Sequence, residues 1–153
     1  MQKERAAALD LSTRAKFIHL ATNGPNGTPD IRVMFNLKSR TRGGALPKAF
    51  VSMATNFSTL LCTNVHSNKT SQALADPNCA LYFENTKNFE GLAVYGKLEP
   101  VEDRAIKAAL WKKGWEMYYH GGIEGGDFQV FRFMPERGRY YHGLQVTEFE
   151  ARV

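Results

Sequence analysis

The stretch STLLCTNVHSNKTSQALADP, residues 58–77, combines the signals of a strand, a helix start and a helix stop. The apolar run 58–62 predicts a strand. Residues 69–76 predict a short helix, because Pro77 disfavours the helical conformation in the residue before it. Ser67 is suited to cap this helix, since its hydroxyl can accept a hydrogen bond from an amide of the first turn. The stretch therefore predicts a strand that turns directly into a helix N-terminus.

This turn has the chemistry of an anion site. A helix N-terminus presents free N–H groups and the positive end of the helix dipole. The Ser67 hydroxyl and the Lys69 ammonium would add a donor and a charge, and together these groups could hold a phosphate. The alternative interpretation is an ordinary capped helix that carries a surface lysine.

Composition and length favour one soluble domain over residues 1–153. Hydrophobic residues make up 43% of the chain and charged residues 23%, as in ordinary globular proteins. Neither a membrane-spanning run nor a signal-peptide pattern occurs, so we expect a cytoplasmic protein without a membrane partner. Cys62 and Cys79 lie in apolar runs, which predicts buried free thiols.

The net charge of +5 is concentrated in a loop-like region at Lys38–Arg42 and Lys48. Such a patch could attract nucleic acid or a phosphorylated ligand. No helix-turn-helix, zinc-finger or aromatic RNA-binding pattern accompanies it. A solvated basic loop is the preferred interpretation, and we expect no specific nucleic-acid partner.

The segment 30–37, DIRVMFNL, alternates as a half-buried strand does. Its aliphatic face would be buried, which leaves Arg32 and Met34 on the opposite face, free to meet a ligand or a partner chain. Ile31, Val33, Phe35 and Leu37 make up the aliphatic face.

The remaining patterns predict a mainly β (α+β) fold, an antiparallel barrel of about seven strands with appended helices. The dense turn signal at 23–27 indicates a hairpin, and Gly96 indicates a bulge or a close backbone approach. Residues 49–53 fit either a strand or a helix. The expected helices are 2–13 and 104–117, and the other expected strands are 17–22, 79–83, 91–98, 127–133 and 139–143, with Pro135 ending the sixth strand.

Searches for catalytic motifs leave few candidates. The four histidines have no metal-ligand spacing, and CxxC and HExxH motifs are absent, so we predict no metal site. No GxGxxG follows a strand, which argues against a Rossmann cofactor site. The aromatic residues between Trp111 and Tyr119 could stack on a planar ligand, or could belong to the core or a subunit interface.

A family resemblance connects these features. The motif Thr63-Asn64, Ser67, Lys69, Leu74, Pro77, Leu81, Phe83, Val94-Tyr95-Gly96 and Glu99, with Arg32 on an earlier strand, resembles the FMN-binding split-barrel superfamily of pyridoxamine-phosphate oxidase. Within it, the chain looks most like the short flavin-binding proteins named after general stress proteins. The resemblance covers about residues 12 to 135, and its weight comes from the order and spacing of individually loose motifs.

The resemblance implies a homodimer with FMN at the subunit interface. Carried over, Arg32, Ser67 and Lys69 would bind the FMN phosphate, and Thr63 and Asn64 would run beside the ring. Met34 shares the face of Arg32 and is a further candidate contact. The partner chain would contribute aromatic contacts, with Trp111 and Trp115 as candidates.

The chain departs from the pattern of the oxidase itself in two places. Asn68 stands where the oxidase usually has a second basic residue, and the C-terminal Arg-x-His substrate element is absent. We therefore expect an FMN-dependent oxidoreductase with an unknown small-molecule redox partner, not a true pyridoxamine-phosphate oxidase. The alternative is a flavin-binding sensor or storage protein without turnover. Some family members bind deazaflavin or haem, so these cofactors stay open, and no side chain stands out as a catalytic acid or base.

Overall fold

The computed structural model describes all residues, 1–153. Three α-helices and seven strands follow one another with four short 3-10 helices between them. The helices are α1 (Gln2–Arg14), α2 (Asn68–Ala75) and α3 (Arg104–Leu110), and the 3-10 helices are η1 (Pro25–Gly27), η2 (Lys48–Met53), η3 (Thr86–Asn88) and η4 (Trp115–Met117). The strands are β1 (Phe17–Asn23), β2 (Pro29–Phe35), β3 (Thr59–Asn64), β4 (Asn78–Asn85), β5 (Glu90–Val101), β6 (Phe128–His142) and β7 (Gln145–Glu150).

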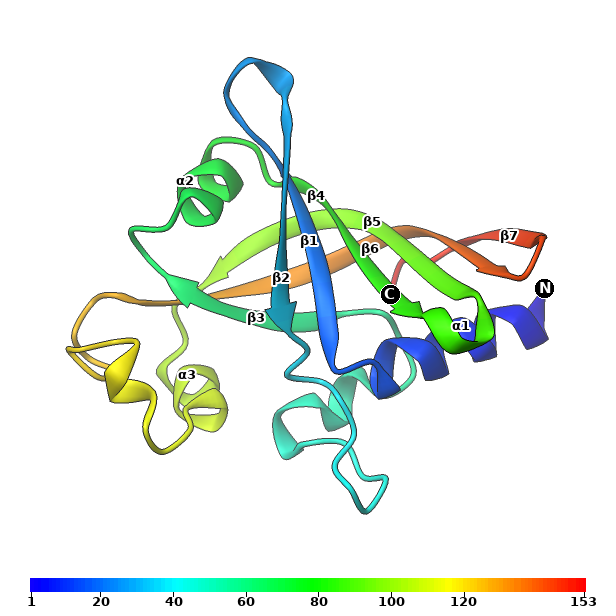
Figure 1. Cartoon of the computed structure of the whole chain (residues 1–153). Coiled ribbons are helices and arrows are strands. Elements are labelled where there is room, and N and C mark those ends of the chain that lie inside the picture. Colours follow the sequence, from blue (N-terminus) through cyan, green and yellow to red (C-terminus); the bar gives the residue numbers. More distant parts are fainter.

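The strands form one antiparallel sheet in the order β2-β1-β4-β5-β6-β3, and β7 pairs with the far part of β6. Strongly twisted sheets of this size curl, and here β2 and β3 end up as the two unpaired edges of an open, split barrel. In Figure 1 the end of β2 crosses β3 near the middle of the view, α2 lies at the upper left and α1 lies at the lower right.

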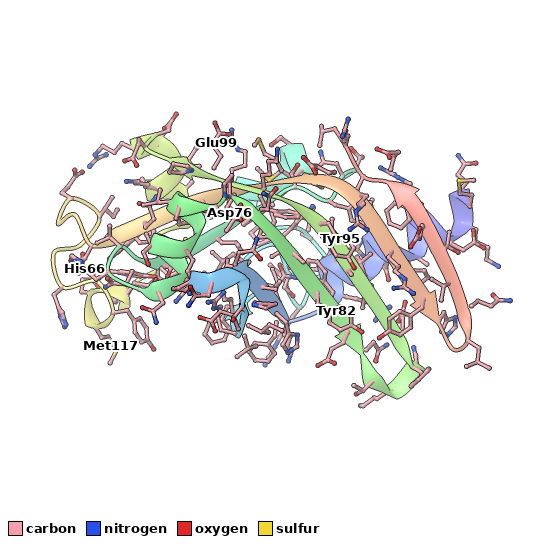
Figure 2. All side chains as sticks on the ribbon, turned by 90° about the horizontal axis from the view of Figure 1, so that it is seen from above. His66, Asp76, Tyr82, Tyr95, Glu99 and Met117 are labelled. Carbon is pink, nitrogen blue, oxygen red and sulfur yellow. The ribbon has the colours of Figure 1, made fainter.

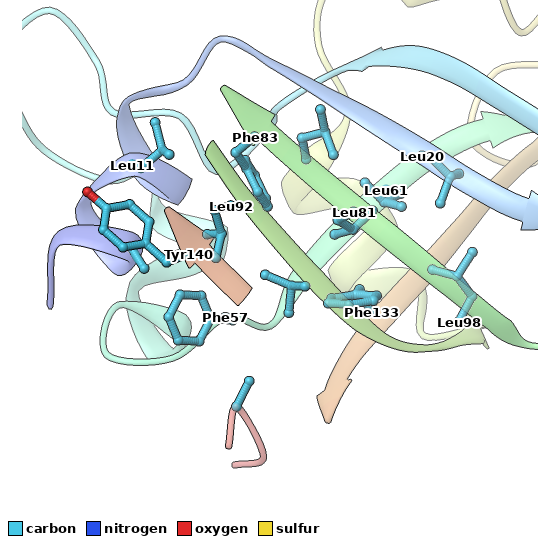
Figure 3. Packing of buried hydrophobic residues seen from close by; sticks show 14 of the residues in the cluster. Leu11, Leu20, Phe57, Leu61, Leu81, Phe83, Leu92, Leu98, Phe133 and Tyr140 are labelled. Atoms are coloured by element: carbon cyan, nitrogen blue, oxygen red, sulfur yellow. The ribbon is translucent and has the colours of Figure 1, made fainter. Parts of the chain in front are cut away.

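The main core fills the inside of the curled sheet. Ile18, Leu81 and Leu92 are fully buried there, and α1 packs against this core through Leu11. Figure 3 shows Leu11 of α1 together with Leu81 and Leu92, which come from different strands. A second, smaller cluster lies under α3 and η2 and contains Phe50, Leu60, Val101, Leu110, Tyr119, Phe128 and Val130. The site described below lies beside this second cluster.

Several expected local structures are confirmed. Residues 23–29 connect the β1–β2 hairpin, and Ser67 caps α2. Gly96 marks a register shift between β5 and β6, and a Cβ there would lie 2.1 Å from the Met134 carbonyl oxygen. This close approach explains why the strand has glycine at this position.

The predicted end of the sixth strand at Pro135 is wrong. β6 continues as one strand through Pro135, and the expected strands 127–133 and 139–143 are its two halves. Proline is tolerated because it pairs with Gly96 at the bulge, where a ladder hydrogen bond is already interrupted. The last strand is instead β7, which the sequence analysis missed.

The expected burial of the strand at 30–37 is also wrong. Ile31, Val33 and Phe35 are 66%, 59% and 74% exposed, whereas Arg32 and Met34 are half-buried. β2 is an edge strand with no element of this chain over its aliphatic face. The alternation was therefore correct, but the covered and uncovered faces are exchanged.

The helix expected over 104–117 ends at Leu110. Trp111 has an extended backbone, and the chain then turns at Gly114, which has a positive φ of 93°, into the 3-10 helix η4. Residues 49–53, for which the sequence left strand and helix open, form part of η2. None of the helices combines the length and the apolar character needed to cross a membrane.

Candidate functional site

A hollow of about 400 Å³ lies where the barrel is open between β2 and β3. Its volume is within the range of small-molecule sites. Most of its lining is apolar or aromatic, and the lining contains one cation and no carboxylate. The lining residues are Val33, Met34, Phe35, Leu37, Cys62, Thr63, Asn64, Lys69, Trp115, Tyr118 and Tyr119.

One end of the hollow is the turn from β3 into α2. Ser67 Oγ accepts a hydrogen bond from the Thr70 amide at 3.4 Å, and it lies 3.1 Å from Thr63 Oγ1. Lys69, in the first turn of α2, lines the hollow and forms no ion pair with any carboxylate. Burial lowers the pKa of Lys69, and the positive charge of Arg32 lowers it further. The structure therefore brings two cations close together at a helix N-terminus.

Arg32 is held in place by a polar network on its own side of the sheet. Its Nη1 donates to Thr22 Oγ1 at 2.6 Å, and its Nη2 donates to Gln72 Oε1 at 3.0 Å. Nη2 also lies 3.1 Å from Asp30 Oδ2 in an ion pair. Because Gln72 belongs to α2, this network ties the edge strand β2 to the same helix whose N-terminus carries Lys69. The sequence offered no signal for Gln72 or Asp30 in this role.

Thr63, Asn64 and Met34 all line the hollow, as expected for residues near a bound ligand. Thr63 is buried and engaged with Ser67. Asn64 Oδ1 accepts a hydrogen bond from the His66 amide at 2.9 Å, which shapes the turn. These residues are on facing edges of the open barrel, so a ligand between them would contact both β2 and β3.

Trp111 and Trp115 have different positions relative to the hollow. Trp115 lines the hollow of its own chain, whereas Trp111 is not part of the lining. Trp111 packs edge-on against Trp115, with ring centroids 6.0 Å apart, and against Phe128 at 5.1 Å. Trp111 thus supports Trp115 from behind. Residues 111–119 form what we call the aromatic loop. In Figure 2, Met117 of this loop lies at the same end of the molecule as His66 of the β3–α2 turn, and the two segments line the same hollow.

The sequence analysis noted that the aromatic residues from Trp111 to Tyr119 could stack on a planar ligand, but it did not select Tyr118 and Tyr119 as site residues. Both were within the aromatic run it noted, but the expected long helix gave no reason to separate them from Trp111. Gly114 and the glycines after His120 were the signals that the helix could not continue.

The open antiparallel barrel, with a strand-to-helix turn at its split, defines a split-barrel protein. A family model described as pyridoxamine 5'-phosphate oxidase matches residues 3–142. The chain therefore belongs to the pyridoxamine 5'-phosphate oxidase family.

Solved structures agree with this assignment. A Clostridium acetobutylicum protein related to general stress protein 26 of Bacillus subtilis shares 28% identity and a TM-score of 0.73, with 98% of this chain and 96% of that chain covered. General stress protein 26 from Bacillus anthracis has the same fold at 13% identity and a TM-score of 0.66, with 95% and 98% covered. A heme binding protein from Mycobacterium smegmatis has it at 19% identity and a TM-score of 0.65, with 95% and 58% covered. No curated protein matches the chain.

Proposed function

We propose that the hollow between β2 and β3 binds FMN and that the protein is an FMN-dependent oxidoreductase. The observation that carries the proposal is the position of Lys69, a cation with no carboxylate partner, in the first turn of α2 and in the lining of a largely apolar hollow. Arg32 is close enough to lower the pKa of Lys69, although its own charge is paired with Asp30. A phosphate dianion fits this end, because it would compensate the charge of Lys69 at a helix N-terminus. A flat ring system fits the apolar end.

Each residue of the proposed site then has a role in holding the cofactor. Lys69 supplies a point charge to the phosphate, Ser67 supplies a hydroxyl at the helix N-terminus, and Arg32 adds a positive charge that its network keeps in position. Thr63 and Asn64 from β3, with Met34 from β2 and Trp115 from the aromatic loop, would border the ring. Trp111 would act through Trp115.

The flavin supplies the redox chemistry when bound, and the protein supplies binding, orientation and shielding from water. No ionisable group in the lining is an evident proton donor or acceptor at neutral pH apart from Lys69, since burial raises the pKa of the Cys62 thiol to about 12. The redox partner is a small molecule that reaches the exposed side of the hollow. The absent Arg-x-His element argues against pyridoxamine phosphate as that partner.

A homodimer is part of the proposal. Three large apolar side chains of β2 are exposed side by side, and Phe17 of β1 adds to them at 49% exposure. Monomeric proteins rarely leave such a face uncovered. The face continues over a shallow trough beside Tyr82 and Tyr95, which lie near each other on the same side of the sheet in Figure 2. Val33 and Phe35 also line the hollow, so a second copy on this face would help to enclose the flavin.

The second candidate is a flavin, deazaflavin or haem binder without turnover. The structural likeness to a heme binding protein supports its haem form at the level of the fold alone. The hollow favours a flavin, because its lining contains no histidine and its one cation lies at a helix N-terminus. A deazaflavin that carries a phosphate would meet the same charged end.

Absorption titrations of the purified protein with FMN, a deazaflavin and haem test the cofactor. We expect saturable binding of FMN with a perturbed visible spectrum, and exclusive binding of haem would overturn the proposal. Anaerobic addition of a reduced nicotinamide to the FMN complex then separates the two functions. Bleaching of the visible band of oxidised flavin is expected of an oxidoreductase, since flavins accept hydride from nicotinamides, whereas a passive binder would stay yellow.

A further inference from the structure

Tyr119 is fixed in the wall of the hollow by aromatic packing. Its ring centroid lies 4.8 Å from that of Phe128, 5.9 Å from that of Trp111 and 6.0 Å from that of Trp115. Its backbone amide donates to the Trp115 carbonyl at 2.9 Å, and its carbonyl accepts from the Gly122 amide at 2.9 Å. The residue is 9% exposed, so its ring has little freedom to turn away.

The hydroxyl of Tyr119 has no hydrogen-bond partner in the protein. By contrast, Tyr140 donates to Glu90 Oε1 at 2.7 Å, and the hydroxyls of Tyr82 and Tyr141 contact each other. Tyr119 Oη keeps some accessible surface, so a bound molecule could reach it. Because Tyr119 lines the hollow, its hydroxyl is free to interact with whatever occupies that space.

This hydroxyl stays protonated over the physiological range. Burial raises the pKa of Tyr119 to about 12, with smaller contributions from Cys62 and Asp127. The group is therefore a hydrogen-bond donor to an acceptor in the hollow at neutral pH. Thr63 Oγ1, the other hydroxyl of the buried lining, is already engaged with Ser67 Oγ.

We propose that Tyr119 donates a hydrogen bond from its hydroxyl to an acceptor atom of the isoalloxazine ring, and so tunes the redox balance of the bound flavin. This inference rests on the proposed function, because it places FMN in the hollow. A strand advances about 3.3 Å per residue, so Cys62 is the β3 lining residue farthest along the strand from the turn that carries Ser67 and Lys69. Tyr119 lies near Cys62 and packs against Trp115, so it is at the end where the ring would lie if the phosphate is at Lys69.

The role predicts a difference between the two oxidation states. Reduction increases the negative charge on the ring, and a donor binds a charged acceptor more strongly than a neutral one. Tyr119→Phe should therefore weaken the binding of reduced FMN about fivefold to tenfold more than that of oxidised FMN. The equivalent change is a fall of about 20–30 mV in the two-electron midpoint potential of bound FMN.

Tyr140→Phe is the matched control. Tyr140 is also buried, at 5% exposed, and would lose the same hydroxyl, but it lies in the main core outside the hollow, where it donates to Glu90 Oε1. We expect its midpoint potential to stay at the wild-type value. The measurement is a spectrophotometric redox titration of each FMN complex, with affinities for both oxidation states from fluorescence titration.

An unchanged potential in Tyr119→Phe would overturn the inference. It would mean equal losses of affinity for oxidised and reduced FMN, and so a packing role only. If Tyr119→Phe does not fold, the test can be made instead with 3-fluorotyrosine incorporated only at position 119. Its fluorine resonance should shift between the oxidised and reduced complexes, and a resonance that is the same in both would overturn the inference. Failure of the wild-type protein to bind FMN would instead refute the proposed function on which the inference depends.

Discussion

Lys38 has a buried charged side chain, although lysine usually projects into solvent. The residue is 2% exposed, and its Nζ donates to the carbonyl oxygens of Asn56 at 2.7 Å and Ser58 at 3.0 Å. No carboxylate is paired with it. It therefore ties the segment after β2 to the segment before β3. The sequence analysis placed Lys38 in a solvated basic loop, which is correct for Arg40, Arg42 and Lys48 but wrong for this residue.

The buried amine predicts a stability that depends on pH. Burial lowers the pKa of Lys38 to about 8 from an ordinary value of 10.5. Between these values the unfolded chain binds more protons than the folded one, so this group makes the free energy of unfolding rise as the pH rises. The contribution across the window is roughly 3 kcal/mol. Urea unfolding at several pH values between these limits measures it.

Lys38→Met isolates the effect from other groups that titrate in the same range. The wild-type protein should gain stability relative to Lys38→Met as the pH rises through this window. Lys48→Met, at an exposed lysine of the same loop, should keep the wild-type slope. A slope in Lys38→Met equal to that of the wild type would show that folding does not lower the pKa of Lys38.

At the level of single residues, the sequence was most informative where local chemistry decides the outcome. Ser67 as a helix cap and Gly96 at a bulge follow from backbone requirements of their immediate neighbours. Lys38 and Tyr119 could not be assigned in this way, because their burial depends on elements distant in the sequence. The partners of Arg32 on α2 depend in the same way on tertiary packing.

At the level of elements, the long strand β6 depends on the match between Gly96 and Pro135. The glycine allows the Met134 carbonyl to approach, and the proline lacks the N–H that the ladder would otherwise need. Sequence patterns gave the type of nearly every element, but they ended β6 at the proline. They also extended α3 by about two turns beyond Leu110, where the chain leaves the helix and Trp111 packs on Phe128.

Gly96→Ala tests the bulge. The added Cβ would lie 2.1 Å from a backbone oxygen, so β5 and β6 would have to separate. We expect a loss of about 2–4 kcal/mol in the free energy of unfolding, at or above the usual range for overpacking. Gly43→Ala is the control, because its Cβ would meet only Thr41 Oγ1 at 3.9 Å. Equal stabilities of the two variants in denaturant unfolding would contradict this account of the bulge.

At the level of the whole molecule, the sequence patterns predicted an antiparallel barrel with appended helices, but they did not predict the order of its strands, in which β1 lies beside β4 and β3 beside β6. The sequence does not show which face of β2 is covered. A single chain offers no means to tell whether an alternating edge strand buries its apolar side within its own core or against another copy. The exposed face of β2 favours the second copy.

Ile31→Lys tests the proposed dimer. Ile31 is exposed on the apolar face and does not line the hollow, so the change adds a charge to the interface alone. Sedimentation at micromolar concentration should give twice the chain mass of 17.2 kDa for the wild type and the single mass for Ile31→Lys. Leu144→Lys, at a 97% exposed site in the β6–β7 turn, should remain dimeric. A monomeric wild type that binds FMN in a one-to-one ratio would contradict the proposal.

The phosphate site is the central claim, and paired titrations with FMN and riboflavin test it most directly. A hydrogen bond to a charged group contributes about 1.5–3 kcal/mol, so Lys69→Ala should weaken FMN binding by roughly 10- to 150-fold. Affinity for riboflavin, which lacks the phosphate, should scarcely change, and Lys48→Ala should change neither. Equal losses for the two ligands in Lys69→Ala would contradict the phosphate site.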